Sequence, residues 1–283
     1  MNDCSPKPLD LAMLRLACQN CSLSDLCLPV GIGLDDVGRL DQIIKRKRPL
    51  ARADHIFRLG DEFRSVYAIR AGSVKTYAMT ETGGEQIIGF YLPGEIIGLD
   101  AIHNGAHPSS ARTLETTSIC EIPFAQLEEL AVAIPSLGRQ LVRIMSREIH
   151  SDDELLTLLG KKSAEERLAS LLMSLSLRLQ QRGFSAREFH LSMSRNDIGN
   201  YLGLAVETVS RLFTRFQQIG LIAVNNKHVR IEDLAALREI AGANRGTCAV
   251  RRVRFPVRRT ERSRGIAPRP LNFRKVPVRL ATF

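Results

Sequence analysis

Hydrophobic residues recur with two different periods along the chain, and the change falls near residue 135. Before that point, between residues 49 and 123, short apolar stretches alternate with glycine-containing turns at 60–61, 71–72, 83–84 and 93–94. Turns spaced by about 8 to 12 residues are typical of a β sandwich or roll. The pattern therefore predicts strands at 55–58, 65–69, 73–78, 86–91 and 119–122.

After Pro135 the apolar positions recur every three or four residues, which is the period of an α-helix. They predict a long amphipathic helix to about residue 160 and a second helix over 164–181. The long helix either pairs two subunits or packs on its own β domain, and its spacing favours neither use. As a dimer seam it would offer Ile144, Ile149 and Asp152. In a parallel dimer Asp152 would meet its symmetry mate, so like-charge repulsion would make the dimer conditional.

A helix-turn-helix pattern follows between residues 194 and 217. Ser194 and Asp197 resemble a capping box that opens a short helix, and Gly203 lies in the turn before a second helix at 206–217. Residues 221–231 then have the pattern of a β-hairpin, which would form a wing. Together these elements predict a winged helix-turn-helix.

The exposed face of the second helix would contact DNA through Val206, Glu207, Ser210 and Arg211. A glutamate can accept from cytosine N4, an arginine can pair with guanine or a phosphate, and a valine can contact a thymine methyl group. These residue types predict recognition of double-stranded DNA. The alternative is that Glu207 and Arg211 form an ordinary solvent-exposed helical pair, but the short turn, the wing and the local charge favour DNA.

The chain of 283 residues has a net charge of +10, but only the part of this charge near the helix-turn-helix pattern supports DNA binding. Residues 245–283 carry +11 by themselves, whereas the rest of the chain carries −1. Within that rest, residues 178–230 carry +5, so a basic stripe coincides with the helix-turn-helix pattern. The tail at 245–283 contains four prolines and little periodicity, and we expect it to be disordered.

Composition narrows the class of protein. Hydrophobic residues make up 44% and charged residues 25%, which is typical of a globular chain long enough for two domains. No apolar run reaches the length of a membrane span and no secretory leader is visible, so we expect a cytoplasmic protein with no membrane partner. The six histidines are scattered and no Ser/His/Asp order or phosphate loop occurs, so we do not expect an enzyme.

Three cysteines, Cys18, Cys21 and Cys27, lie close together near the N-terminus. Three thiols need a fourth ligand to complete either a tetrahedral zinc site or an iron–sulfur cluster. Disulfides are disfavoured in a cytoplasmic protein, and a redox dithiol would need a βαβ context that the pattern lacks. Spacing alone favours zinc at least as much as iron and sulfur.

Several motifs in a fixed order resemble the FNR branch of the CRP/FNR transcription regulators, the fumarate and nitrate reduction regulators. The resemblance covers about residues 16–243. It rests on the three spaced cysteines and on five short segments: LPGE at 92–95, CEIP at 120–123, AEERL at 164–168, DIGNYLGL at 197–204 and ETVSR at 207–211. It implies an α+β fold with an N-terminal β-roll of the cyclic-nucleotide-binding type, a long dimerisation helix and a C-terminal winged helix-turn-helix.

The resemblance also implies a function. Cys18, Cys21, Cys27 and Cys120 would ligate an oxygen-labile 4Fe-4S cluster, and the cluster-bound protein would dimerise under anoxia. The dimer would bind a palindromic operator and control genes of anaerobic metabolism. RNA polymerase would be a further partner, through the turn at 80–84 and the loop at 116–118.

Relatives in the other branch of the family bind a cyclic nucleotide through a Gly-Glu pair and an Arg-Ser pair. Here Gly98-Leu99 and Ser109-Ser110 stand in those places, and Arg112 is two positions out of register. A buried phosphate without its arginine loses a bidentate charged contact, so we expect no cyclic nucleotide. The alternative functions are a zinc-stabilised or a cyclic-nucleotide-responsive DNA-binding regulator of the CRP type.

These interpretations divide the chain into five parts. We expect a cysteine-rich cluster-binding segment at 1–30, a sensor roll at 31–134, a dimerisation helix at 135–160, a DNA-binding domain at 161–244 and the basic tail at 245–283.

Overall fold

The computed structural model describes residues 18–81 and 83–242. Cys4, Cys248 and the basic tail predicted at 245–283 lie outside the described residues. All described residues fall within one of the two compact units into which the chain divides. No helix in the described ranges is both long enough and apolar enough to cross a membrane.

The roll consists of two antiparallel four-stranded sheets, with strand orders β1-β8-β3-β6 and β2-β7-β4-β5. Its strands are β1 (Lys45–Arg46), β2 (His55–Phe57), β3 (Ser65–Ala71), β4 (Val74–Met79), β5 (Glu85–Tyr91), β6 (Ile96–Ile97), β7 (Ser110–Thr113) and β8 (Ser118–Pro123). The turn between β3 and β4 requires glycine at Gly72. Its φ is +84°, and an added Cβ would lie 2.5 Å from the carbonyl oxygen of Thr116.

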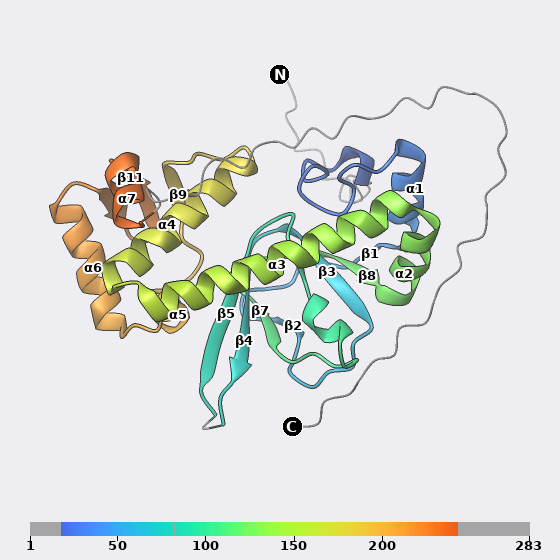
Figure 1. The fold of residues 1–283 in the computed structure, drawn as a ribbon, viewed down its shortest axis with the longest axis horizontal. Helices are drawn as coiled ribbons and strands as arrows, with labels where there is room; N and C mark the ends of the chain where they lie inside the picture. The colour runs from blue at the N-terminus through green and yellow to red at the C-terminus, as the bar shows by residue number, and fades with distance from the viewer. Residues whose placement is uncertain (1–17, 82, 243–283) are drawn as a thin grey trace, which may run out of the picture. The chain divides into compact units, whose positions relative to one another are not determined.

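The helices that precede the winged helix lie beside the roll, and α3, the longest of those described, runs across it (Figure 1). They are the short 3-10 turns η2 (Cys18–Asn20) and η3 (Leu99–Ile102), and the α-helices α1 (Leu34–Ile43), α2 (Phe124–Ala133) and α3 (Pro135–Lys161). Proline is well suited to the first position of α3, where its missing N–H leaves no hydrogen bond unmade. The long helix predicted from the three-to-four spacing is therefore present.

The winged helix is built on α4, whose N-cap Ser163 forms a capping box with Glu166. Its elements are α4 (Ala164–Gln181), β9 (Glu188–His190), α5 (Arg195–Leu202), α6 (Val206–Gln218), β10 (Ile222–Asn225), β11 (His228–Ile231) and α7 (Leu234–Ile240). The predicted capping box of Ser194 and Asp197 opens α5, and the predicted wing is the β10–β11 hairpin. Strand β9 extends the wing to a three-stranded sheet in the order β10-β11-β9.

The two faces of α3 have different environments. Its N-terminal half buries Leu137, Gln140 and Ile144 in the core that also holds Leu127 of α2. Ile149 is 63% exposed, and Asp152 is exposed as well. Ile144, a candidate for the dimer seam, thus packs inside its own subunit, whereas Ile149 and Asp152 face outward.

Candidate functional site

The four candidate ligands, Cys18, Cys21, Cys27 and Cys120, line one pocket although Cys120 is far from the others in sequence. Cys18 belongs to η2, Cys21 and Cys27 to the loop that follows, and Cys120 to β8. All four are free thiols. Apolar side chains, among them Leu28, form much of the remaining wall.

Short turns shape the loop that carries the first three thiols. The Cys21 N–H donates to the Cys18 carbonyl at 3.3 Å, and the Cys27 N–H donates to the Leu23 carbonyl at 3.0 Å. Gln140, a buried residue of α3, donates its amide to the Cys27 carbonyl at 3.3 Å. A direct hydrogen bond thus links the cysteine loop to the long helix.

Burial makes three of these thiols, those of Cys18, Cys27 and Cys120, poor acids. It raises the pKa of Cys18 to about 12, with further increases from Asp41, and it raises the pKa of Cys27 to about 12. Burial also raises the pKa of Cys120. Cys18, Cys27 and Cys120 are therefore protonated at neutral pH, and a metal centre must displace their protons to bind the thiolates.

The thiols as they stand are not arranged as a finished metal site. In the described part of the chain no group of three or more His, Cys, Asp or Glu side chains is placed to hold a metal ion. The pocket between the thiols has a volume of about 30 Å³, so a cluster would have to push the loop outward. Four cysteines around an apolar pocket nevertheless match the donor set of a 4Fe-4S cluster, and the loop that would move lacks regular structure beyond η2.

Two residues that the sequence did not indicate, Asp41 and Arg46, lie beside the cysteines. Asp41 accepts a hydrogen bond from the Cys18 N–H at 2.9 Å, and Arg46 donates from Nη2 toward the Cys18 sulfur at 3.8 Å. Asp41 and Arg46 also form an ion pair with each other. Arg46 belongs to the run KRKR at 45–48, which in sequence has the appearance of a solvated basic surface, so no local signal marks it.

The predicted DNA-contacting residues share the exposed side of α6. Glu207, Ser210 and Arg211 are exposed, and Val206 is 37% exposed. The Ser210 hydroxyl donates to the Val206 carbonyl at 2.9 Å. While that bond persists, the hydroxyl can act toward a DNA base only as a hydrogen-bond acceptor. The opposite side of α6 is buried in the domain core through Val209, Leu212, Phe213 and Phe216.

Glycine allows α5 and α6 to approach closely. A Cβ on Gly199 would lie 2.6 Å from the carbonyl oxygen of Leu204, and Gly203 has a φ of +63° in the turn.

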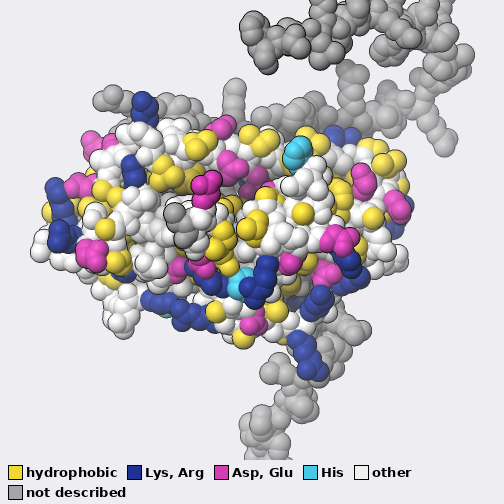
Figure 2. Space-filling model, turned by 90° about the horizontal axis from the view of Figure 1, so that it is seen from below, with side chains coloured by type: hydrophobic (Ala, Val, Ile, Leu, Met, Phe, Trp, Pro, Cys, Tyr) yellow, Lys and Arg dark blue, Asp and Glu magenta, His cyan; other side chains and the backbone are white. Residues whose placement is uncertain are grey.

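On the face of the molecule seen in Figure 2, basic and acidic side chains are interspersed, so no single-sign field covers the described surface there. The recognition helix, rather than overall charge, is what distinguishes a candidate DNA interface.

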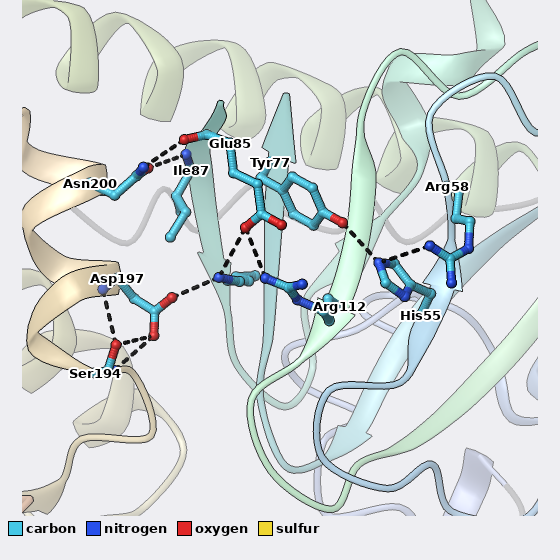
Figure 3. Close-up of polar contacts among 10 residues, drawn as sticks. His55, Arg58, Tyr77, Glu85, Ile87, Arg112, Ser194, Asp197 and Asn200 are labelled. Atoms are coloured by element: carbon cyan, nitrogen blue, oxygen red, sulfur yellow. Dashed lines mark hydrogen bonds and ion pairs between the residues drawn. The ribbon is translucent and has the colours of Figure 1, made fainter. Parts of the chain in front are cut away.

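The roll contacts the helix-turn-helix through a polar network (Figure 3). Asn200 of α5 donates to the Glu85 carbonyl at 2.6 Å and accepts from the Ile87 N–H at 2.5 Å. Lys75 of β4 donates to Asp197 at 2.7 Å. Burial acts to raise the pKa of Asp197, but hydrogen bonds from Lys75 and Ser194 outweigh it and hold the pKa below its usual range.

A second contact joins the roll to α4. Glu95 lies in the turn after β5 and pairs with Arg178 and Arg182 of α4, with 2.6 Å to Arg182. Burial acts to raise the pKa of Glu95, yet the two guanidinium groups and the Leu92 N–H lower it overall. The carboxylate is therefore ionised and anchors both arginines.

The exposed face of α3 carries an apolar stripe interrupted by one acid. Val142, Met145, Ile149 and Leu156 are 61%, 37%, 63% and 69% exposed, and Asp152 falls between the last two. Successive members are three or four residues apart, as in the seam of a coiled coil. Sequence reasoning identified Ile149 and Asp152 in this stripe and did not single out the other three as seam residues.

Comparisons with known proteins match both parts of the chain. Residues 47–133 match the family of cyclic nucleotide-binding domains, and residues 166–240 match the Crp-like helix-turn-helix domain. The transcriptional activator protein Anr of Pseudomonas protegens is 56% identical over 227 residues, which cover 80% of this chain and 93% of Anr. The fumarate and nitrate reduction regulatory protein of Escherichia coli K12 is 51% identical, with coverage of 81% and 91%.

A solved structure agrees with these matches. FixK2 from Bradyrhizobium japonicum superposes with a TM-score of 0.65 at 28% identity, over 70% of this chain and 97% of FixK2. The predicted fold class, a roll followed by a long helix and a winged helix-turn-helix, is confirmed. The expectation of a non-enzymatic protein is confirmed too, because the relatives are transcriptional regulators.

Proposed function

Because this chain belongs to the FNR type of the CRP/FNR transcription regulators, we propose that it binds DNA as a dimer when a 4Fe-4S cluster is present. Oxygen would destroy the cluster and release the DNA. The observation that carries this proposal is the convergence of four free thiols from two distant segments on one pocket. The protein would act in the cytoplasm, where its thiols stay reduced.

Cys18, Cys21, Cys27 and Cys120 would hold the cluster, which supplies an oxygen-labile group that crosslinks the N-terminal loop to β8. Outward movement of the loop would reach α3 through the Cys27 carbonyl, which accepts from Gln140. Gln140 lies on the buried face of the helix whose exposed face carries the stripe with Asp152. The loop is thus in contact with the element that would form the dimer seam.

The stripe on α3 supports a conditional dimer. Four exposed apolar residues would be covered by the partner, and this burial would favour association. Burial and the neighbouring carboxylates Asp153 and Asp100 already raise the pKa of Asp152 in a single subunit. A second copy of Asp152 would add repulsion, so a small change in helix position would decide whether the subunits pair.

A dimer would present two copies of α6 to successive major grooves of a palindromic operator. Val206, Glu207, Ser210 and Arg211 would contact base edges or phosphates, since they are exposed at the N-terminal end of the recognition helix. Contacts with RNA polymerase would involve the exposed turn near Thr80 and the loop around Thr116, by analogy with the family. Anr carries the description of a transcriptional activator, and we propose activation here as well.

A zinc-stabilised regulator is the competing function, because four thiolates also form a complete tetrahedral zinc site. Anaerobic purification followed by absorption spectroscopy and iron, sulfide and zinc analysis separates the two. We expect broad visible absorption, about four irons and four sulfides per chain, and loss of operator binding after admission of air. One zinc per chain without iron or sulfide would overturn the cluster proposal.

Serine variants assign the ligands. Cys18→Ser, Cys21→Ser, Cys27→Ser and Cys120→Ser should each abolish the anaerobic visible absorption, because each removes one thiolate. Cys248→Ser is the matched control and should retain it. Full absorption in the Cys120→Ser protein would show that β8 does not contribute the fourth ligand.

A further inference from the structure

Arg70 belongs to the wall of the thiol pocket, and a second arginine, Arg46, lies beside the pocket with an unusual set of contacts. Arg46 donates from Nη2 toward the Cys18 sulfur at 3.8 Å and forms an ion pair with Asp41. We infer that Arg46, fixed by Asp41, is a positioning residue that holds Cys18 opposite Cys120 and donates hydrogen bonds to the sulfur of the bound cluster. This inference rests on the proposed function, because it concerns how the same site retains its cluster.

The first support is that Asp41 and Arg46 each form a hydrogen bond with Cys18. Asp41 Oδ1 accepts the Cys18 N–H at 2.9 Å, while Arg46 reaches the Cys18 sulfur. The 3-10 turn η2 has only three residues, so its own helix contributes little to fixing Cys18. The position of this ligand therefore depends on Asp41 in α1 and Arg46 in β1.

The second support is the strand register. Arg46 pairs with Cys120 across the β1–β8 ladder, and Lys45 pairs with Glu121. One residue thus neighbours Cys120 through its backbone and Cys18 through its side chain. This arrangement joins two ligands that lie 102 residues apart in sequence, and no other residue in the described ranges has a hydrogen bond to Cys18 together with a ladder position opposite Cys120.

The third support is an unused donor. The Arg46 side chain is only 18% exposed, and its Nε is buried without a hydrogen-bond acceptor among the described residues. A buried N–H without an acceptor is destabilising, so such groups are rare unless something else satisfies them. Sulfur of a bound cluster would be an acceptor of the right charge for this donor.

The physical effect follows from the charges. A 4Fe-4S cluster with four thiolate ligands is anionic in its usual states, and hydrogen bonds to its sulfurs stabilise that charge. Asp41 already neutralises Arg46, so the effect we infer comes from hydrogen bonding and ligand placement more than from net charge. A lysine at position 46 would keep the positive charge. It would lack the planar guanidinium group, whose several N–H donors can bind Asp41 and a sulfur atom at the same time.

The alternative is that Arg46 and Asp41 form a salt bridge that stabilises only the packing of α1 against β1. Such a bridge would change the unfolding of the apo protein and leave cluster retention unchanged. Iron release under anoxia distinguishes the two roles, because it reports on the ligand environment and needs no DNA-binding assay.

The experiment uses full-length protein reconstituted anaerobically with iron and sulfide, and measures the rate at which a chelator removes iron. We expect Arg46→Gln to release iron about tenfold faster than the wild type, a size typical of residues that hold metal ligands. Arg46→Lys and Asp41→Asn should fall between the two. Arg48→Gln, which alters an exposed arginine two residues away, should match the wild type.

The thiolate-to-iron absorption band supplies a second readout and should shift in Arg46→Gln but not in Arg48→Gln. Wild-type release rates in Arg46→Lys and Asp41→Asn would overturn the inference, even if Arg46→Gln failed to fold. Failure of the wild type itself to take up iron and sulfide would instead overturn the proposed function.

Discussion

Lys75 of the roll and Asp197 of the helix-turn-helix form a charged hydrogen bond of 2.7 Å that joins the two parts of the chain. The Lys75 side chain is 8% exposed and that of Asp197 is 15% exposed. Asp197 also accepts from Ser194 in the capping box of α5. A single carboxylate therefore both caps α5, the first helix of the helix-turn-helix, and links that helix to the roll.

Replacing Lys75 with methionine should lower the free energy of unfolding by roughly 1–3 kcal/mol, because it leaves the Asp197 carboxylate buried without its cation. Urea titration of the apo protein measures the loss. The control is Arg230→Met, which removes a cation that is 56% exposed from beside Glu232, itself 41% exposed, and should cost no more than about 1 kcal/mol. Equal losses in the two variants would contradict a special role for the Lys75 contact.

Asp152→Ala should make the apo protein dimerise and bind its operator in air. The substitution removes the acid from an otherwise apolar stripe, and the repulsion between two copies disappears with it. Sedimentation in air measures the change. Asp153→Ala is the matched control, since Asp153 is exposed next to the stripe but outside its spacing, and it should stay monomeric. Identical sedimentation of all three proteins would contradict the seam.

Substitution of Glu207 on α6 should weaken the sequence specificity of DNA binding. Glu207→Ala should relax discrimination at one base pair of each half-site, with a loss of about 1–3 kcal/mol for the preferred base. Operator binding to a set of single-base variants measures this. Gln218→Ala, an exposed position at the far end of α6, should leave the preference intact. An unchanged base preference in Glu207→Ala would show that this carboxylate does not contact a base.

Glu148 should make the stability of the apo protein depend on pH. Burial, with the nearby negative charges of Glu95 and Asp152, raises its pKa from 4.5 to about 7. The folded state then binds more protons than the unfolded state between these values, so stability falls as the pH rises from about 5 to 8. Glu148→Gln should remove this loss, and its advantage over the wild type should be larger at pH 8 than at pH 5.

Denaturant titrations of the apo protein at the two pH values measure that difference. Glu129→Gln, a substitution of an exposed acid on α2, is the control and should show no such pH-dependent advantage. A Glu148→Gln protein with the same advantage at both pH values would contradict the raised pKa.

Local patterns were sufficient to predict much of the fold. The glycine-containing turns between the strands, the period of 3.6 in α3 and α6, and the capping box at Ser194 all follow from interactions within a few residues. The spacing of Cys18, Cys21 and Cys27 likewise marked a possible metal-binding loop. Helices α1 and α2 and strand β9 were not predicted, since they are short and their apolar residues become a pattern only against the roll.

What the sequence determined by itself is the order of the elements and the residue types that each one exposes. Tertiary structure alone decided which face of α3 is free, because Ile144 packs into the core that also holds Leu127 while Ile149 does not. It also placed Arg46 beside Cys18 and Lys75 beside Asp197. Such contacts join residues far apart in the chain, and their energies depend on burial and distance, which no local spacing records.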